Sequence, residues 1–128
     1  NMANGKRAYW LTDTISVSAN ATLEAELRVG ANERFTGRKL LIQRTAGFEI
    51  RSITDDSGLP FTNADSGDPL TGDSFPDALT EHAGYLELQA PIIVEKSNAI
   101  KFSVTDTSGA TNVVRVIILG EMEQLEKT

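Results

Sequence analysis

Strict alternation of apolar and polar residues is the feature that most constrains what this chain can fold into. Between residues 15 and 29 every second residue is apolar, and polar or charged residues fill the positions between them. The apolar members are Ile15, Val17, Ala19, Ala21, Leu23, Ala25, Leu27 and Val29. Side chains of a β-strand alternate between two faces, whereas the apolar face of a helix recurs every three or four residues. The segment is therefore predicted to be one strand, or two strands joined near Asn20.

Shorter segments predict further strands in pairs. Residues 40–44 are predicted to be a strand and are followed by an Ala46-Gly47 turn, after which residues 48–54 are expected to return as the partner strand. Residues 100–105 alternate, and a polar loop whose residues tolerate turn geometry leads from them to a last strand at 112–119. These last two strands form the clearest predicted hairpin.

The chain has no long helical pattern. Residues 86–90 alternate and add another strand, whereas Ser74 opens at most one short helical turn. Many short strands with long excursions between some of them predict an all-β fold, a two-sheet antiparallel sandwich of jelly-roll type. An immunoglobulin-like sandwich is the alternative. We expect one domain over residues 1–128, with a short polar N-terminal arm at 1–7 and a charged C-terminal tail at 121–128.

The composition leaves few groups for catalysis or metal binding. The chain has no cysteine and one histidine, His82, which is predicted to lie in a loop. Zinc and iron sites usually need several His or Cys ligands, and nucleophilic catalysis needs a base beside the nucleophile. No catalytic residue, cofactor or metal site is therefore predicted, and enzymatic activity is not expected.

Calcium binding by the acidic segment at residues 55–77 stays open. The candidate oxygen ligands there are Asp55, Asp56, Asn63, Asp65, Asp68, Asp73 and Asp77. Their spacing does not match the twelve-residue calcium loop, so a solvated acidic loop is the simpler interpretation.

The net charge of −6 is unevenly distributed. Residues 1–51 hold eight Lys/Arg and five Asp/Glu, whereas residues 52–128 hold four Lys/Arg and thirteen Asp/Glu. This imbalance fits a mixed solvated surface or an attraction between subunits. The basic residues are dispersed, without a basic stripe, so nucleic acid is not expected as a partner. No stretch approaches the ~20 apolar residues of a membrane span, and residues 1–7 do not resemble a signal peptide, so no membrane partner is expected.

Two segments are apolar on both faces. In the last strand, Val113, Ile117 and Leu119 lie opposite an apolar row of even-numbered residues, and only Arg115 interrupts them; residues 40–42 behave similarly. In a two-layer sandwich one face of each strand is exposed to solvent, and its residues are usually polar. Either the chain's own arm or a neighbouring subunit is therefore expected to cover the outer face, and a second copy is favoured because the N-terminal segment is short and the tail is charged. The predicted interface residues are Leu40, Ile42, Val113, Arg115, Ile117 and Leu119.

The C-terminal third has a familiar order of elements. Pro91-Ile92-Ile93-Val94 is followed by a turn, a strand at 97–104, a polar turn and an apolar strand at 112–120 that ends in Gly120. This ending resembles small jelly-roll virion proteins of tailed phages, and residues 38–58 resemble their strand–turn–strand with its polar loop. The resemblance implies a head- or tail-associated structural protein, of decoration, vertex or fibre-base type, that is oligomeric about a three- or five-fold axis.

The expected function is a non-enzymatic structural subunit of a phage particle. It would be located in the virion as a capsid-associated, decoration or vertex protein. Its expected partners are itself, as a homo-oligomer with a trimer among the options, and other virion proteins.

The alternative function is a carbohydrate-binding or other ligand-binding β-sandwich module. Adjacent Tyr9 and Trp10 would point to opposite faces of a strand, one toward the core and one toward solvent, where an aromatic ring could stack on a sugar.

Overall fold

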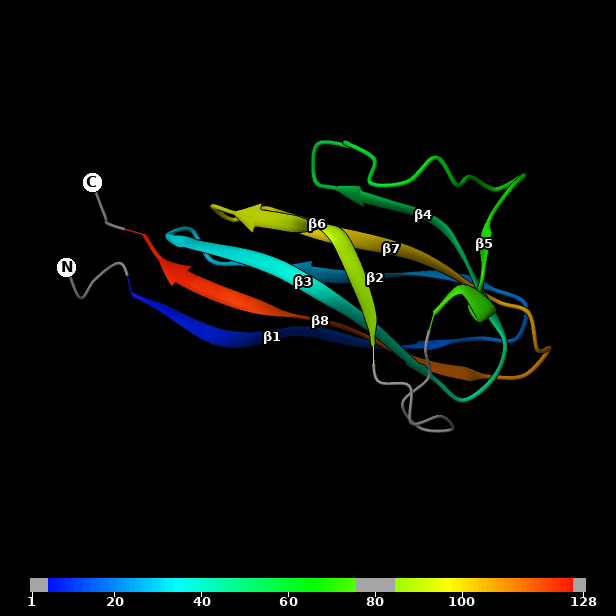
Figure 1. Ribbon diagram of the computed structural model, residues 1–128. Coiled ribbons are helices and arrows are strands. Elements are labelled where there is room, and N and C mark those ends of the chain that lie inside the picture. The colour runs from blue at the N-terminus through cyan, green and yellow to red at the C-terminus, as the bar shows by residue number, and fades with distance from the viewer. Residues whose placement is uncertain (1–4, 76–84, 126–128) are drawn as a thin grey trace.

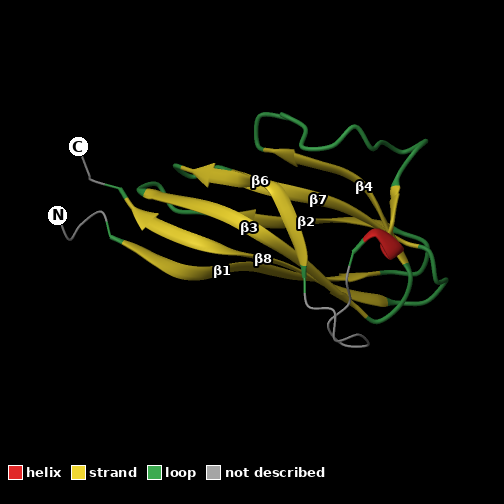
Figure 2. Cartoon of the chain, in the orientation of Figure 1, coloured by secondary structure: helices red, strands yellow, loops and turns green. Residues whose placement is uncertain are grey.

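The computed structural model describes residues 5–75 and 85–125 (Figure 1). Its elements are β1 (Lys6–Val17), β2 (Thr22–Arg28), β3 (Glu33–Arg44), β4 (Phe48–Asp55), β5 (Leu70–Thr71), the 3-10 turn η2 (Gly72–Ser74), β6 (Leu86–Glu95), β7 (Ala99–Asp106) and β8 (Asn112–Gln124). Strands therefore dominate the described part of the chain, as the alternation predicts (Figure 2). The turn at Asn20, which has a positive φ of 59°, divides the long alternating segment into β1 and β2.

The strands form two four-stranded antiparallel sheets. Sheet A has the order β1-β8-β3-β6, and sheet B has the order β2-β7-β4-β5. The first strand thus pairs with the last, the second with the seventh, the third with the sixth and the fourth with the fifth. This is the strand order of a jelly roll, so the predicted fold is confirmed and the immunoglobulin-like alternative is not.

Both predicted hairpins are wrong in their pairing. β3 and β4 belong to opposite sheets, and so do β7 and β8, so the turns between them cross from one sheet to the other. Only β4 and β5 are neighbours in both sequence and sheet. Alternation fixes which residues of a strand share a face, but it carries no information about the partner strand.

The expected arm and tail are also shorter than predicted. Lys6 and Arg7 already belong to β1, and β8 continues past Gly120 to Gln124. Met122 is fully buried while Glu121 is exposed, so the alternation of β8 extends through the charged segment. The charged residues of this segment occupy the outward positions of the strand, so its composition resembles that of a tail.

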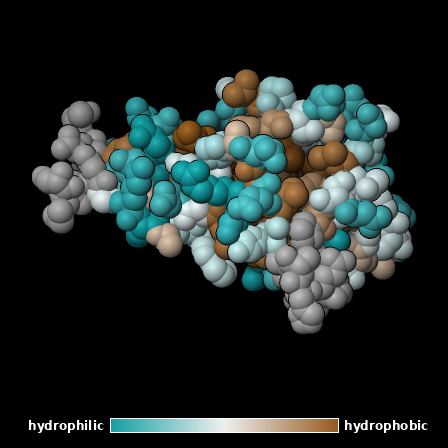
Figure 3. All heavy atoms as spheres, viewed as in Figure 1, coloured by the Kyte–Doolittle hydropathy of each residue, from teal (hydrophilic) through white to brown (hydrophobic). Residues whose placement is uncertain are grey.

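The core lies between the two inner faces. Sheet A contributes Leu11, Ile15, Leu40, Ile42, Val114, Val116, Ile118 and Met122, and sheet B contributes Ala25, Leu27, Phe48, Ile50, Ile53, Ile100, Phe102 and Val104. All of these side chains belong to one buried cluster. In the view of Figure 3, apolar residues gather over the middle of the molecule with hydrophilic residues around them.

Sheet A is bent at a bulge where two glycines face each other. The register of β3 against β8 shifts between Gly37 and Lys39, so Arg38 is an extra residue on β3. Gly37 pairs with Gly120 immediately before the shift. A Cβ added at Gly120 would overlap the Thr36 carbonyl oxygen and lie 2.8 Å from the Cα of Gly37. The two backbones approach this closely because neither residue has a side chain.

Substitution of Gly120 tests this close approach. We expect Gly120→Ala to lower the free energy of unfolding by about 3 kcal/mol, at the upper end of overpacking costs, because the obstacle is backbone. Gly67→Ala is the matched control, since its Cβ would meet only the Asp65 carboxylate oxygen at 3.5 Å. Urea unfolding should show a change within about 0.5 kcal/mol for the control. Equal stabilities for the two variants would contradict the close approach.

Candidate functional site

The two outer faces of the sandwich differ in chemistry. The outer face of sheet B is polar, and its side chains are Thr22, Glu24, Glu26, Arg28, Ser52, Thr54, Lys101, Ser103 and Thr105. Many of its charges are paired: Asp56 accepts hydrogen bonds from Arg28 at 2.7 Å and forms an ion pair with Lys101 at 3.1 Å. These two cations lower the pKa of Asp56. This face is a hydrated surface that needs no cover.

The outer face of sheet A carries apolar residues. The register places Trp10, Leu119 and Lys39 in one row across β1, β8 and β3, and the next rows are Thr12, Ile117, Leu41 and Thr14, Arg115, Gln43. The residues between these rows, including Leu11, Ile118 and Leu40, point into the core. We call the three rows together with Val113 the outer patch. Trp10 is 65% exposed and Val113 is 43% exposed.

The structure separates the predicted interface residues into two groups. Val113, Arg115, Ile117 and Leu119 lie on the outward side of β8, although Ile117 is only 5% exposed. Leu40 and Ile42 are wrong as surface residues, because both point inward and are buried in the core. A strand with apolar residues on both faces does not reveal which face is the inner one.

Trp10 and Leu41 are the apolar residues of the outer patch that the sequence did not assign to the interface. The prediction that Tyr9 and Trp10 face opposite ways is confirmed, since Tyr9 packs edge-on against Phe35 with ring centroids 6.1 Å apart. The sequence does not predict that Trp10 lies beside the last strand, because it carries no information on the pairing of β1 with β8. Leu41, the middle residue of the apolar run 40–42, takes the outward position.

A cavity of about 340 Å³ adjoins the outer patch. It is lined by Ala8, Arg38, Lys39, Tyr85, Leu119, Gly120 and Glu121. The Lys39 ammonium lies 4.3 Å from the centroid of the Tyr85 ring and donates a hydrogen bond to its hydroxyl oxygen at 3.1 Å. This contact raises the pKa of Lys39. The cavity thus combines an aromatic ring, a cation and an apolar floor.

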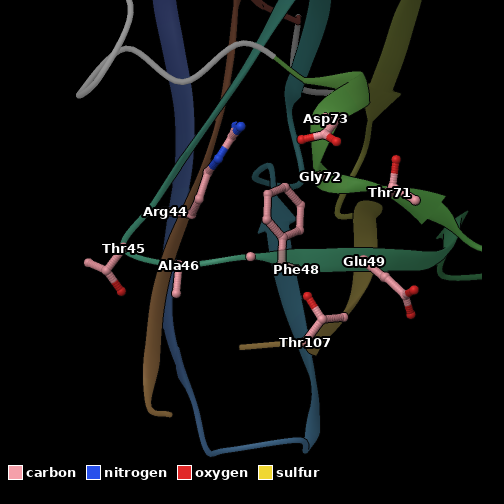
Figure 4. A pocket seen from close by; sticks show the side chains of 10 residues that line it. Arg44, Thr45, Ala46, Phe48, Glu49, Thr71, Gly72, Asp73 and Thr107 are labelled. Carbon is pink, nitrogen blue, oxygen red and sulfur yellow. The ribbon is translucent and has the colours of Figure 1, made fainter. Parts of the chain in front are cut away.

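A larger hollow of about 410 Å³ lies at the end of the sandwich where β3 turns into β4. Residues from three segments line it, namely Arg44, Thr45, Ala46, Gly47, Phe48, Glu49, Thr71, Gly72, Asp73 and Thr107. The Phe48 ring lies at its centre, with Arg44 on one side and Thr71 on the other (Figure 4). Phe48 stacks on Phe75 with centroids 6.1 Å apart, and Arg44 donates a hydrogen bond to the Phe75 carbonyl oxygen at 2.8 Å. These contacts hold the loops together.

A buried polar pair fixes the loops around this hollow. Asp106 accepts hydrogen bonds from the Asn20 amide at 2.9 Å and from the Ser108 hydroxyl at 2.6 Å. Asn112 donates to Asp106 at 3.1 Å and to the Gly47 carbonyl oxygen at 2.8 Å. The Asn20 and Ser108 donors are the main reasons that the pKa of Asp106 lies far below its usual value. Asp106 therefore links the β1–β2 and β7–β8 connections, and Asn112 links Asp106 to the β3–β4 connection.

The acidic segment is engaged in its own turns. Asp55 accepts hydrogen bonds from the Ser57 hydroxyl at 2.8 Å and the Leu59 amide at 2.9 Å, which lower its pKa. Asp65 accepts a hydrogen bond from the Gly67 amide at 2.8 Å. Within residues 5–75 and 85–125, no three His, Cys, Asp or Glu side chains gather as a metal site would require. Asp77 and His82 lie outside the described residues.

In the described part of the chain, no helix has the length and apolar character needed to cross a membrane. Comparison of the chain with protein-family models, curated proteins and solved structures finds no match.

Asp106 makes the stability of the loop end depend on pH. Because its pKa is lowered by folding, its contribution is complete above the unfolded-state value of about 4 and is lost as the pH falls toward the folded-state value. We expect Asp106→Asn to be less stable than the wild type at pH 7 and to lose less stability between pH 5 and pH 3. Urea unfolding at several pH values measures both. Parallel stability curves for the two proteins would contradict this role of Asp106.

Proposed function

We propose that this chain is a non-enzymatic structural subunit of a phage particle, of capsid-associated, decoration or vertex type. It assembles with copies of itself and with other virion proteins through the outer patch. The observation that carries the proposal is the difference between the two outer faces. Sheet B presents polar and largely paired side chains to water, whereas sheet A presents an exposed tryptophan beside apolar residues of β8 and β3.

Exposed apolar residues that gather on one face support association. Single apolar residues on a surface are ordinary, but a contiguous patch rimmed by polar groups is typical of an interaction site. Trp10, Leu119, Ile117 and Leu41 are neighbours in the register, and charged or amide side chains flank them. Trp10 lies on β1, at the edge of sheet A, and tryptophan is among the residue types that most often dominate binding energy.

The use of the titratable groups supports a non-enzymatic role. The carboxylates with clearly lowered pKa values are Asp55, Asp56 and Asp106. All three are engaged in hydrogen bonds or ion pairs that hold loops to strands. Jelly rolls serve as capsid proteins, lectins and enzymes alike, so the fold by itself does not decide the function.

A carbohydrate-binding module is the second candidate, and one observation favours it. The Trp10 ring is 65% exposed on a sheet face. Leu119, its partner in the register, also lines the cavity that holds Tyr85 and Lys39. Aromatic rings and hydroxyl or amine donors beside a shallow hollow are what a sugar ring can use.

Replacement of Trp10 tests the role of the outer patch in assembly. We expect Trp10→Ser to weaken self-association, measured by sedimentation equilibrium, at least about tenfold, since buried tryptophans contribute most to such interfaces. Leu59→Ser is the control, because Leu59 is similarly exposed but lies outside the patch. A wild-type monomer whose tryptophan fluorescence changes on addition of a glycan would instead support the carbohydrate-binding candidate.

The location in the particle is tested independently of self-association. Mass spectrometry of particles purified from the virus that encodes the chain should find it in many copies per particle. Treatment that releases decoration proteins without opening the capsid should remove a capsid-associated subunit. Absence of the chain from such particles would overturn the structural role.

A further inference from the structure

The outward row of β8 carries opposite charges at the two ends of an apolar pair. Along the strand its side chains are Val113, Arg115, Ile117, Leu119, Glu121 and Glu123. Arg115 precedes the apolar pair and Glu121 follows it, at equal distances in sequence from Ile118. At ~3.4 Å per residue the two charges lie about 20 Å apart, so they do not neutralise each other within one chain.

Among the described residues, neither of these charges has a partner of opposite charge. Arg115 donates a hydrogen bond to the Thr14 hydroxyl oxygen at 2.8 Å, and within the described ranges neither Arg115 nor Glu121 takes part in an ion pair. Elsewhere on sheet A, Arg34 is paired with Glu95 at 2.9 Å and with Glu123 at 3.4 Å, and Lys39 contacts the Tyr85 hydroxyl. Arg115 and Glu121 therefore stand apart as exposed, unmatched charges at the rim of the apolar residues.

We infer that two copies of the chain stack face to face in an antiparallel, two-fold arrangement centred on Ile118, with Arg115 of each copy opposite Glu121 of the other. The inference rests on the proposed use of the outer patch and adds the occupant and its orientation. A two-fold interface requires that whenever one residue contacts another, the reverse contact also occurs. An axis that crosses β8 at Ile118 meets this condition for both charges, and it stacks Ile117 on Leu119 of the other copy.

Other arrangements of the same row are less favourable. An antiparallel stack centred on Ile117 places Arg115 on Leu119 of the other copy. A stack centred on Leu119 places Glu121 on Ile117 of the other copy. Each would bury a charge against an apolar side chain. A parallel stack places Arg115 on Arg115 and Glu121 on Glu121, where like charges repel. The row therefore selects one orientation and one register.

The neighbouring strand β1 fits this arrangement, while on β3 the same rotation lays Lys39 over Leu41 of the second copy. Because Trp10 pairs with Leu119 and Thr12 pairs with Ile117, the same rotation lays Trp10 over Thr12 of the second copy. Four strands ~4.8 Å apart and about 12 residues long give sheet A a face of about 760 Å². A standard stable interface buries ~800 Å² on each partner, so the face is of the size that such a dimer needs. A two-fold contact differs from the three- or five-fold oligomer that the resemblance to virion proteins implies.

Charge reversal tests the register directly. The full chain is used, with dimer dissociation constants from sedimentation equilibrium at low and at physiological salt. Arg115→Glu and Glu121→Arg each place like charges opposite each other twice per dimer, and each should weaken the dimer at least tenfold. The double variant Arg115→Glu/Glu121→Arg restores both opposite-charge contacts and should return within about threefold of the wild type. Glu24→Arg, the same charge change on the outer face of sheet B, should leave the dimer unchanged.

The outcomes separate this inference from the proposed function. Thermal unfolding at low concentration first establishes that every variant is folded. Weakening by both single variants with rescue by the double variant supports the antiparallel dimer. If the single variants weaken the dimer and the double variant does not restore it, the antiparallel dimer is overturned. It is also overturned if the single variants have no effect while Trp10→Ser still weakens association. Both results leave assembly through the outer patch in place. A monomer at all concentrations that is nevertheless abundant in the particle also overturns the dimer, and identifies other virion proteins as the occupants.

Discussion

The pairing of the first strand with the last is the interaction on which the rest of the structure depends. β1 and β8 are in register over twelve residue pairs, from Lys6 with Glu123 to Val17 with Asn112. This ladder completes sheet A, and it brings Trp10 beside Leu119, two residues that are far apart in the sequence. Contacts of such long range close large loops, so jelly rolls belong to the slowly folding topologies. The outer patch exists only once this ladder has formed.

Much of the fold could be predicted from the sequence, because alternation reports directly on which side chains share a face. The strand character of the alternating segments and the opposite directions of Tyr9 and Trp10 follow from it, whereas the first parts of β1 and β3 and the short β5 lie outside the predicted segments. The jelly-roll class was inferred from the long excursions between strands. Strand partners could not be predicted, since an alternating strand pairs equally well with any other. The two expected hairpins failed for this reason. The end of β8 was missed because Glu121 and Glu123 mask an alternation that continues to the buried Met122.

The candidate site was predicted only in part, and the reason is again the ambiguity between faces. The sequence correctly marks β8 as a strand with apolar residues on both sides. It does not say whether Leu40 and Ile42 or Leu41 turn outward, and the bulge at Arg38 decides this by shifting the register of β3. The same bulge depends on Gly37 and Gly120, which let the two strands approach. Local backbone geometry thus determines which apolar residues reach the surface.

The position of the two ends of this ladder has a mechanical consequence. Lys6 and Glu123 are paired neighbours, so the beginning of β1 and the end of β8 leave the sandwich side by side (Figure 1). Tension applied through these two ends would load the ladder one hydrogen bond at a time and open it like a zipper. A force directed along the strands from the opposite loops would load many bonds at once. The molecule is therefore built to resist pulling in one direction far better than in the other.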